Sequence, residues 1–295
     1  MSLEIYGLMT AGVAALVAGL LLVRPRFRAA SGAEKALVLG PVFEAGAMAV
    51  FGAEHFLAAQ DIMGLVPRWL PGPLFWTYFV GAAWIAAAIS FIAWRQVRWS
   101  AGLLALAFLI IVATIDLPNL PINAGKRFFW TLTFRELAFA GGAMVLAGSV
   151  WPHRTLASIT LIRLGRGIVA TVLVFYGIQH FLFPLFVPGV PLEKLIPAWV
   201  PLPAVLSYLV GIILVLSGIG LFVGSTIRIA AATAGIMLLL LTVFFYGPIL
   251  VLEFNTDLAV EGINYVFDTM LFAGTALLAG FGADGGVLNS AGARS

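Results

Sequence analysis

Two histidines occupy matched places in a duplicated motif, and an imidazole in such a motif can make hydrogen bonds or bind a metal. His55 and His180 each stand in Gly-x-x-His-Phe-Leu. Each copy then leads to Pro-x-Trp-x-Pro, with Trp69 in the first copy and Trp199 in the second. A motif repeated in this way indicates an internal duplication. We therefore expect a site around the duplicated element.

The two histidines admit four roles. An interfacial histidine could hold the re-entering Pro-Trp-Pro loop, or it could bond a quinone carbonyl together with Glu54. One histidine from each copy could also ligate a haem, which nothing else in the sequence favours. A metal site would lack a ligand spacing such as H-E-x-x-H. Trp69 and Trp199 lie between prolines that fix their backbone, so we expect these loops to cap a cavity.

Glu136 and Asp268 are matched carboxylates inside apolar stretches. A charged group in hydrocarbon costs at least about 2.5 kcal/mol, so each needs an explanation. The two could converge on a symmetry axis or line two equivalent pockets. They could be protonated and bond neighbouring helices, or they could accept protons beside a reducible ligand. In the second case they are the candidate catalytic residues.

Asp116 and Arg135 are expected at similar depth on neighbouring helices. Their counterparts in the second half of the chain, Tyr246 and Phe267, are both uncharged. Two charges that are absent together are expected to neutralise each other where they occur. The sequence therefore predicts an intramembrane ion pair between Asp116 and Arg135, either as a helix clamp or as a charge-gated site.

The composition is that of an integral membrane protein. Hydrophobic residues make up 62% of the 295 residues and charged residues only 10%, whereas soluble domains are about a quarter charged. The net charge of +3 does not suggest nucleic-acid binding, because the basic residues lie in short loops. The chain has no cysteine, which excludes disulfides and an iron–sulfur cluster held by this chain.

The elements that position these residues are predicted to be nine membrane-spanning helices in an all-α bundle. The apolar runs long enough to span about 30 Å of hydrocarbon are 3–23, 37–57, 74–94, 101–117, 129–150, 168–183, 203–223, 229–252 and 263–281. The first run has its arginines after it and not before it, so we interpret it as a retained helix.

The nine helices are predicted to form two parallel four-helix repeats behind one N-terminal helix. Tyr78 and Gly81 match Tyr208 and Gly211 at a constant offset of 130. An even number of spans in each unit places both units the same way round in the membrane. The predicted domains are residues 1–30 for the leading helix, 31–155 for the first repeat and 156–295 for the second.

The basic residues of the loops predict the orientation, since they gather on the cytoplasmic side. With the N-terminus outside, the inner side holds Arg24, Arg26, Arg28, Lys35, Arg95, Arg98, Arg154, Arg163, Arg166, Arg228 and Arg294, and the outer side holds Arg68, Lys126, Arg127 and Lys194. We therefore expect a bacterial-type plasma (inner) membrane protein with its N-terminus outside and its C-terminus in the cytoplasm.

The duplicated motif and the segment FRELAFAGGAMVLAG, which begins at Phe134, resemble the DoxX/DoxD-like membrane protein family. Members typically have about four spans, and their last helix often opens with a basic-acidic pair before a Gly-Gly-Ala sequence. Residues 36–282 resemble two tandem copies. The second copy keeps only Asp268, Gly274 and nearby small residues of this pattern. The resemblance implies association with respiratory or redox partners, although no sulfur-handling residue is recognisable here.

The sequence thus predicts a redox-associated membrane subunit that binds a quinone or a similar apolar ligand near its outer face. Glu54, His55 and His180 would bind the head group, Glu136 and Asp268 would manage protons, and Trp69 and Trp199 would close the pocket. A protein partner would supply electrons, because the chain has no haem, flavin or cluster motif. The alternatives are a structural or assembly subunit with a lipid-filled cavity and a small-molecule transporter. A transporter would usually show matched broken helices at the midplane.

Overall fold

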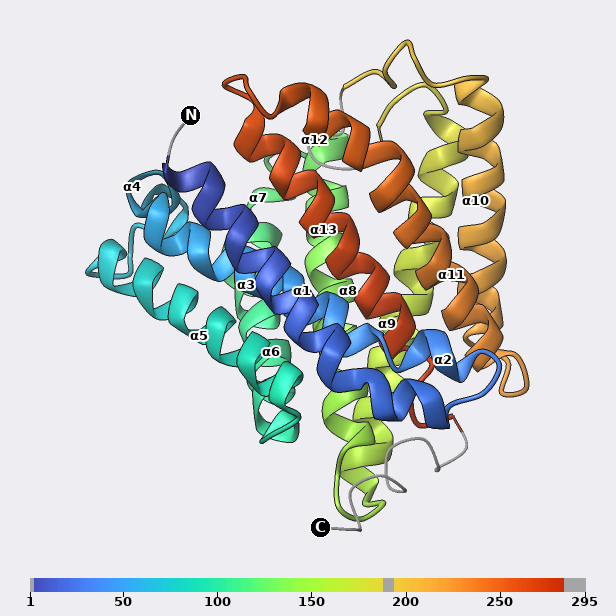
Figure 1. The fold of residues 1–295 in the computed structure, drawn as a ribbon. Helices are drawn as coiled ribbons and strands as arrows, with labels where there is room; N and C mark the ends of the chain where they lie inside the picture. The colour runs from blue at the N-terminus through green and yellow to red at the C-terminus, as the bar shows by residue number, and fades with distance from the viewer. Residues whose placement is uncertain (1–2, 188–193, 284–295) are drawn as a thin grey trace.

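The computed structural model describes residues 3–187 and 194–283, and this part of the chain forms a helical bundle (Figure 1). Its helices are α1 Leu3–Ala29, α2 Glu34–Leu37, α3 Gly40–Leu57, α4 Ala59–Ile62, η1 Met63–Leu65, α5 Pro73–Ala93, α6 Val97–Ile111, η2 Val112–Asp116, α7 Leu117–Asn119, α8 Arg127–Ser149, α9 Leu156–Leu182, α10 Pro203–Gly220, α11 Ile227–Leu241, η3 Thr242–Tyr246, α12 Gly247–Glu253 and α13 Ala259–Leu278. The predicted all-α membrane bundle is confirmed. Of the predicted residues, Arg294 lies outside the described part.

Seven helical segments of the described residues are long and apolar enough to cross a membrane. They contain α1, α3, α5, α6, α9, α10 and α11. Two further helices, α8 and α13, have 23 and 20 residues but carry the charges of the predicted site. Both lie in the middle of the bundle (Figure 1), where 138–148 and 270–278 are buried without interruption. Because their neighbours are other helices, these two need less apolar surface than a lipid-facing helix.

The boundaries differ most from the prediction at α9, which begins at Leu156 and not near residue 168. Arg163 and Arg166 interrupt the hydropathy of its first three turns. Arg166 turns back to donate hydrogen bonds to the carbonyls of Ala279 (2.8 Å) and Phe281 (2.6 Å) at the end of α13. Cations at a helix C-terminus satisfy carbonyls that have no partner within the helix, so these arginines belong to the helical structure.

The duplication is visible as a π-helical turn at the matched position of each repeat. Helix α6 passes into the π-helical turn η2 at Val112–Asp116, and α11 passes into η3 at Thr242–Tyr246, again at an offset of 130. A proline follows each turn, Pro118 and Pro248. Proline has no amide hydrogen and its ring collides with the carbonyl four residues earlier. The helix widens at that point in both repeats.

The glycines of the duplicated motif bring two helices into close contact. A Cβ on Gly52 in α3 would lie 2.9 Å from the carbonyl oxygen of Gly81 in α5. A Cβ on Gly177 in α9 would lie 2.8 Å from that of Gly211 in α10. The motif phenylalanines stack on the matched tyrosines of the next helix, at 5.4 Å and 6.1 Å between ring centroids. The Gly and Phe positions of the motif therefore serve helix packing.

The two repeats exchange their last helices. In the first repeat α8 packs on α6 but also, more extensively, on α9 of the second repeat. In the second repeat α13 packs on α11 and equally on α3 of the first. The two exchanged helices also contact each other. The core of the molecule is thus shared between the repeats.

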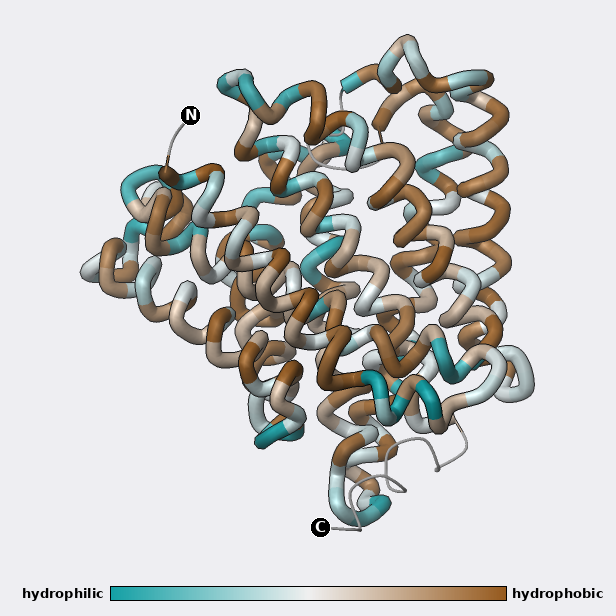
Figure 2. The backbone as a smooth tube through the Cα atoms, viewed as in Figure 1, coloured by the Kyte–Doolittle hydropathy of each residue, from teal (hydrophilic) through white to brown (hydrophobic). Residues whose placement is uncertain are grey.

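The polar segments gather at the two ends of the bundle (Figure 2). In the view of Figure 1, α1 begins at the upper end and α13 runs from the upper end downward. Of the helices that follow the Pro-x-Trp-x-Pro loops, α10 starts at the upper end, and α5 runs downward from the left edge of the view. Arg135 and Glu136 lie eight and nine residues after the start of α8, and Asp268 lies nine residues after the start of α13.

Candidate functional site

Arg135 in α8 stands at the centre of a charged cluster. Its Nη1 donates to Oδ2 of Asp268 in α13 at 3.0 Å, and its Nη2 donates to Oε1 of Glu136 at 3.0 Å. The three side chains are 17%, 20% and 12% exposed. Glu136 and Asp268 therefore converge on one cation. The cluster has one carboxylate more than it has cations, which is the composition needed to bind a proton.

The predicted ion pair between Asp116 and Arg135 is wrong. Both terminal nitrogens of Arg135 are already held, and Asp116 forms no ion pair among the described residues. Asp116 ends the π-helical turn η2 and is buried, and its Oδ2 has no hydrogen-bond partner within the described part of the chain. The prediction failed because it looked for a partner within one repeat. The central position of α13 brings Asp268 across from the other repeat.

His180 in α9 is buried and its hydrogen bonds are made with α10. Its Nδ1 lies 3.0 Å from Oγ of Ser207, and the same Oγ donates to the His180 carbonyl at 3.2 Å. This carbonyl lacks the usual helical donor, because residue 184, four positions later, is a proline and has no amide hydrogen. Ser207 replaces that donor. His180 is thus anchored by the helix end and by the neighbouring helix.

His55 is held differently, although its motif is the same. Its Nδ1 lies 2.7 Å from the carbonyl oxygen of Phe51 on its own helix, and the residue is only partly buried. Thr77, which matches Ser207, bonds the carbonyl of Pro73 in α5. Glu54 accepts a hydrogen bond of 3.0 Å from Asn264 in α13. The two histidines are therefore not equivalent.

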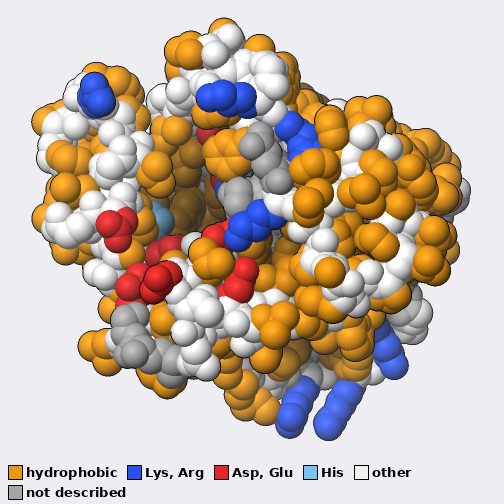
Figure 3. All heavy atoms as spheres, turned by 90° about the horizontal axis from the view of Figure 1, so that it is seen from above, with side chains coloured by type: hydrophobic (Ala, Val, Ile, Leu, Met, Phe, Trp, Pro, Cys, Tyr) orange, Lys and Arg blue, Asp and Glu red, His pale blue; other side chains and the backbone are white. Residues whose placement is uncertain are grey.

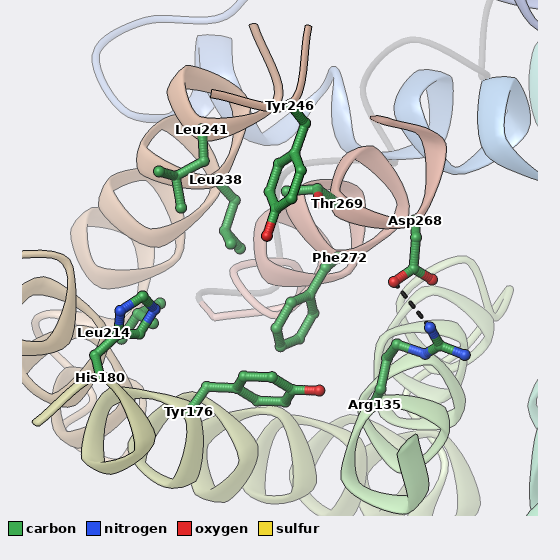
Figure 4. Close-up of a pocket in the computed structure, with 10 residues that line it drawn as sticks. All are labelled: Arg135, Tyr176, His180, Leu214, Leu238, Leu241, Tyr246, Asp268, Thr269 and Phe272. Carbon is green, nitrogen blue, oxygen red and sulfur yellow. Dashed lines mark hydrogen bonds and ion pairs between the residues drawn. The ribbon is translucent and has the colours of Figure 1, made fainter. Parts of the chain in front are cut away.

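A small cavity of about 40 Å³, lined by helices of the second repeat and by Arg135 of α8, reaches the charged cluster (Figure 4). Its lining residues come from α8, α9, α10, α11, η3 and α13. They are Arg135, Tyr176, His180, Leu214, Leu238, Leu241, Tyr246, Asp268, Thr269 and Phe272. The Tyr176 hydroxyl donates to the Thr131 carbonyl at 2.8 Å. Of the predicted site residues, the structure brings Arg135, His180 and Asp268 to this cavity, with Glu136 beside Arg135.

The other predicted binding residues lie elsewhere. His55, Glu54, Trp69 and Trp199 do not line this cavity. Trp69 is 69% exposed, and Trp199, 43% exposed, packs on Phe245 at 6.1 Å between ring centroids. The expectation that Trp69 closes a pocket therefore has no support in this structure. Its loop is fixed instead by Trp76, whose indole N–H donates to the Pro71 carbonyl at 3.0 Å.

The upper half of the bundle contains polar atoms that are buried and without a hydrogen-bond partner within the described residues. These atoms are Asp116 Oδ2, Arg135 Nε, Gln179 Oε1, Glu253 Oε2 and Asn264 Oδ1. Buried polar groups are almost always satisfied by protein or water. The upper end is also hollowed near its middle, with acidic and basic side chains around the hollow and apolar ones within it (Figure 3). The layer beneath this end can therefore bind water or a polar group of a ligand.

Glu44 in α3 is a further carboxylate within the predicted membrane-spanning helices. It is 1% exposed, and its Oε1 accepts a 3.0 Å hydrogen bond from Thr275 of α13. Its Oε2 has no partner within residues 3–187 and 194–283. The matched position of the second repeat is Val169, which packs against Gly141. Glu44 therefore joins α3 to α13 at a contact that is apolar in the other repeat.

Several of these residues were not found from the sequence. Tyr176 precedes the second motif where the first has Phe51, and Tyr246 ends a π-helical turn. Such turns occur frequently at functional sites, and the matched prolines 118 and 248 were a signal for them. Among the described residues, no three His, Asp or Glu side chains lie close enough together to hold a metal ion.

One segment of the chain is similar to a known family model. Residues 44–120 match a domain of unknown function, DUF8561. The match begins at Glu44, includes His55 and ends after the π-helical turn at Asp116, so it covers about a quarter of the chain. The comparisons with curated proteins and with solved structures gave no match.

Proposed function

We propose that this protein is a redox-associated membrane subunit that binds a quinone, or a similar apolar ligand with a hydrogen-bonding head group, in the upper half of its bundle. The observation that supports this most directly is the convergence of Glu136 and Asp268, from matched helices of the two repeats, on Arg135. Ionisable groups are costly in the membrane, and they usually mark ligand, ion or proton sites.

Two features favour a ligand over a purely structural cluster. A structural subunit with a lipid-filled cavity would be expected to have a self-paired polar layer, whereas five polar atoms of this layer have no protein partner in the described chain, so that water or a ligand group must supply one. The extra carboxylate of the cluster also suits a group that exchanges a proton when a bound ligand changes its redox state. The DoxX/DoxD-like resemblance adds the expectation of an electron-supplying protein partner.

The cavity in the second repeat sets a limit on where the ligand lies. A drug-sized ligand needs about 300 Å³ or more, and the cavity measures about 40 Å³. The body of the ligand would therefore lie in the hollow of the upper end, with its head group toward the charged cluster. Glu54 and His55 would contact it from the first repeat, and His180 from the second.

We further propose that the upper end faces the periplasm of a bacterial-type inner membrane, with the C-terminus in the cytoplasm. The basic residues of the short loops support this orientation. Because the chain has no cysteine, single cysteines can test it. A cysteine at Lys126 should react with an impermeant maleimide in intact cells, and one at Arg95 should react only after lysis. The opposite pattern would reverse the orientation.

Mass spectrometry of an organic extract from the detergent-purified protein tests the ligand. A quinone near one per chain, depleted in Asp268→Asn but retained in Asp257→Asn, is the expected result. Asp257 is exposed in the loop before α13, so its variant controls for loss of a carboxylate elsewhere. Phospholipid alone in the wild-type extract would favour the structural subunit instead. Size-exclusion profiles of both variants would show whether either is misfolded.

A further inference from the structure

Two leucine side chains of the second repeat leave space for the cavity beside His180. Leu214 and Leu238 line it, and at the same offset of 130 the first repeat has Trp84 and Phe108. Those two aromatic rings are buried and stack with 5.1 Å between their centroids. The exchange of two aromatic side chains for leucines leaves room in the second repeat where the first has rings.

The hydrogen bonds of Ser207 define the tautomer of His180. A serine hydroxyl has one hydrogen and two lone pairs. Its hydrogen is needed by the His180 carbonyl, which cannot be reached by an amide at Pro184. The Oγ atom can then only accept from Nδ1, which lies 3.0 Å away. In the neutral imidazole Nδ1 therefore carries the hydrogen, and Nε2 is a hydrogen-bond acceptor.

The other end of the cavity presents a hydrogen-bond donor. Arg135 lines it from α8, and its buried Nε–H has no acceptor among the described residues. Figure 4 shows Arg135 and His180 on opposite sides of the space, with Tyr176 and Phe272 between them. An occupant that links the two sides must accept a hydrogen bond at one and donate one at the other. Hydroxyl groups and water do both, and a carbonyl oxygen does only the first.

The volume agrees with this chemistry. A cavity needs roughly 10–15 Å³ to hold one water molecule, so 40 Å³ gives room for at least one. That space accepts a hydroxyl group with its neighbouring atoms, but it does not accept a complete ring. A ligand would insert only the end of its head group, and the remainder would stay outside.

We infer that the second repeat contains a hydroxyl-binding subsite in which His180 Nε2 is the acceptor, occupied by water or by the O–H of a bound head group. The binding of a head group at this subsite rests on the function proposed above and specifies it further. A quinol carries hydroxyls, whereas a quinone carries only carbonyls. The subsite should therefore bind the reduced form in preference to the oxidised form.

Titration of the full-length protein in detergent with a short-chain quinol and with its quinone tests this preference. The quinol should bind at least about tenfold more tightly. Leu214→Trp, which installs the first repeat's side chain, should abolish that preference by filling the subsite. Leu216→Trp is the matched control on the same helix, because Leu216 is 63% exposed on the lipid-facing side and its replacement should leave binding unchanged.

Nitrogen-15 NMR of labelled histidine measures the tautomer independently of any ligand. Replacement of His55 and of His153 by Gln assigns the three histidine signals. We expect hydrogen on Nδ1 of His180 in the wild type, and we expect Ser207→Ala to release this tautomer and to reduce the preference for quinol. A high-resolution structure would show the water that donates to Nε2 when no ligand is present.

The outcomes separate the two proposals. If neither quinol nor quinone binds, but His180 carries its hydrogen on Nδ1 and water donates to Nε2, the proposed function fails and the subsite is a water site. If quinone binds as tightly as quinol, or if His180 carries its hydrogen on Nε2, the inference is overturned while quinone binding itself stands. Quinol preference that survives Leu214→Trp would also overturn it.

Discussion

At the scale of single residues, the stability of the cluster around Arg135 depends on the pairing of its buried charges. Its guanidinium holds Asp268 and Glu136 at 3.0 Å each, in a layer where water is scarce. A buried charge that loses its partner costs far more than the intact pair contributes. The cluster should therefore tolerate the loss of Arg135 poorly.

Arg135→Met should destabilise the protein by about 3–5 kcal/mol, because it leaves two buried carboxylates without a cation. Asp116→Asn is the matched comparison, since Asp116 is buried in the same half of the bundle but forms no ion pair in the described chain. Its effect should be about 1 kcal/mol or less. Thermal unfolding of the purified proteins in one detergent measures both. Equal losses of stability in the two variants would indicate that Asp116 and Arg135 form an ion pair after all.

At the scale of elements, the duplicated motif has two separate purposes. Its glycine and phenylalanine pack the first helix of each repeat on the second. The carbonyl oxygen of the glycine on the second helix lies within 3 Å of where a Cβ on the motif glycine would be. Its histidine is present in both repeats but has different neighbours in each. The packing purpose is the same in both repeats, so any functional asymmetry must come from the neighbours of the histidines.

Gly177→Ala should destabilise the protein by about 1–3 kcal/mol, the usual cost of overpacking. The new Cβ would lie 2.8 Å from the Gly211 carbonyl oxygen, and a backbone atom cannot move aside cheaply. Gly167→Ala, three turns earlier on the same helix, is the control. Its nearest neighbour would be 3.9 Å away, and alanine favours a helix over glycine by about 1 kcal/mol. A thermal unfolding series in which both variants behave alike would contradict the close contact of α9 with α10.

At the scale of the whole molecule, the exchange of α8 and α13 makes the two repeats dependent on each other. Each repeat without its partner would expose the first-helix face that the exchanged helix covers. The predicted boundary near residue 155 is therefore a boundary in sequence, whereas the packed core crosses it. The exchange also brings Asp268 to Arg135, so the candidate site exists only in the complete chain.

Residues 1–155 and 156–295, expressed separately, should each aggregate or be degraded in the membrane. Expressed together, they should associate, because α8 would recover α9 and α13 would recover α3. Affinity purification through a tag on one fragment, followed by size exclusion, measures the association. A monodisperse first fragment without its partner would show that the repeats fold independently.

The sequence alone determined the class of the protein, its helices and its duplication. Long apolar runs with few charges can only form membrane-spanning helices in this composition. The helix ends were predicted to within a few residues, except at the end of α1, which continues to Ala29 and not to residue 23, and at the start of α9, where Arg163 and Arg166 lie inside the helix. Local composition governs these features, and local composition is visible in a sequence.

Only the tertiary structure decided which charges meet. Asp116 and Arg135 were expected to pair because both belong to one repeat, yet Arg135 binds Asp268 from the other. The matched motif likewise placed the two histidines at corresponding positions, and the structure gave His180 a buried place beside a cavity and His55 a more exposed one. Partner choice depends on the packing of helices far apart in the chain, and the pattern of apolar residues that places a helix in the membrane does not encode it.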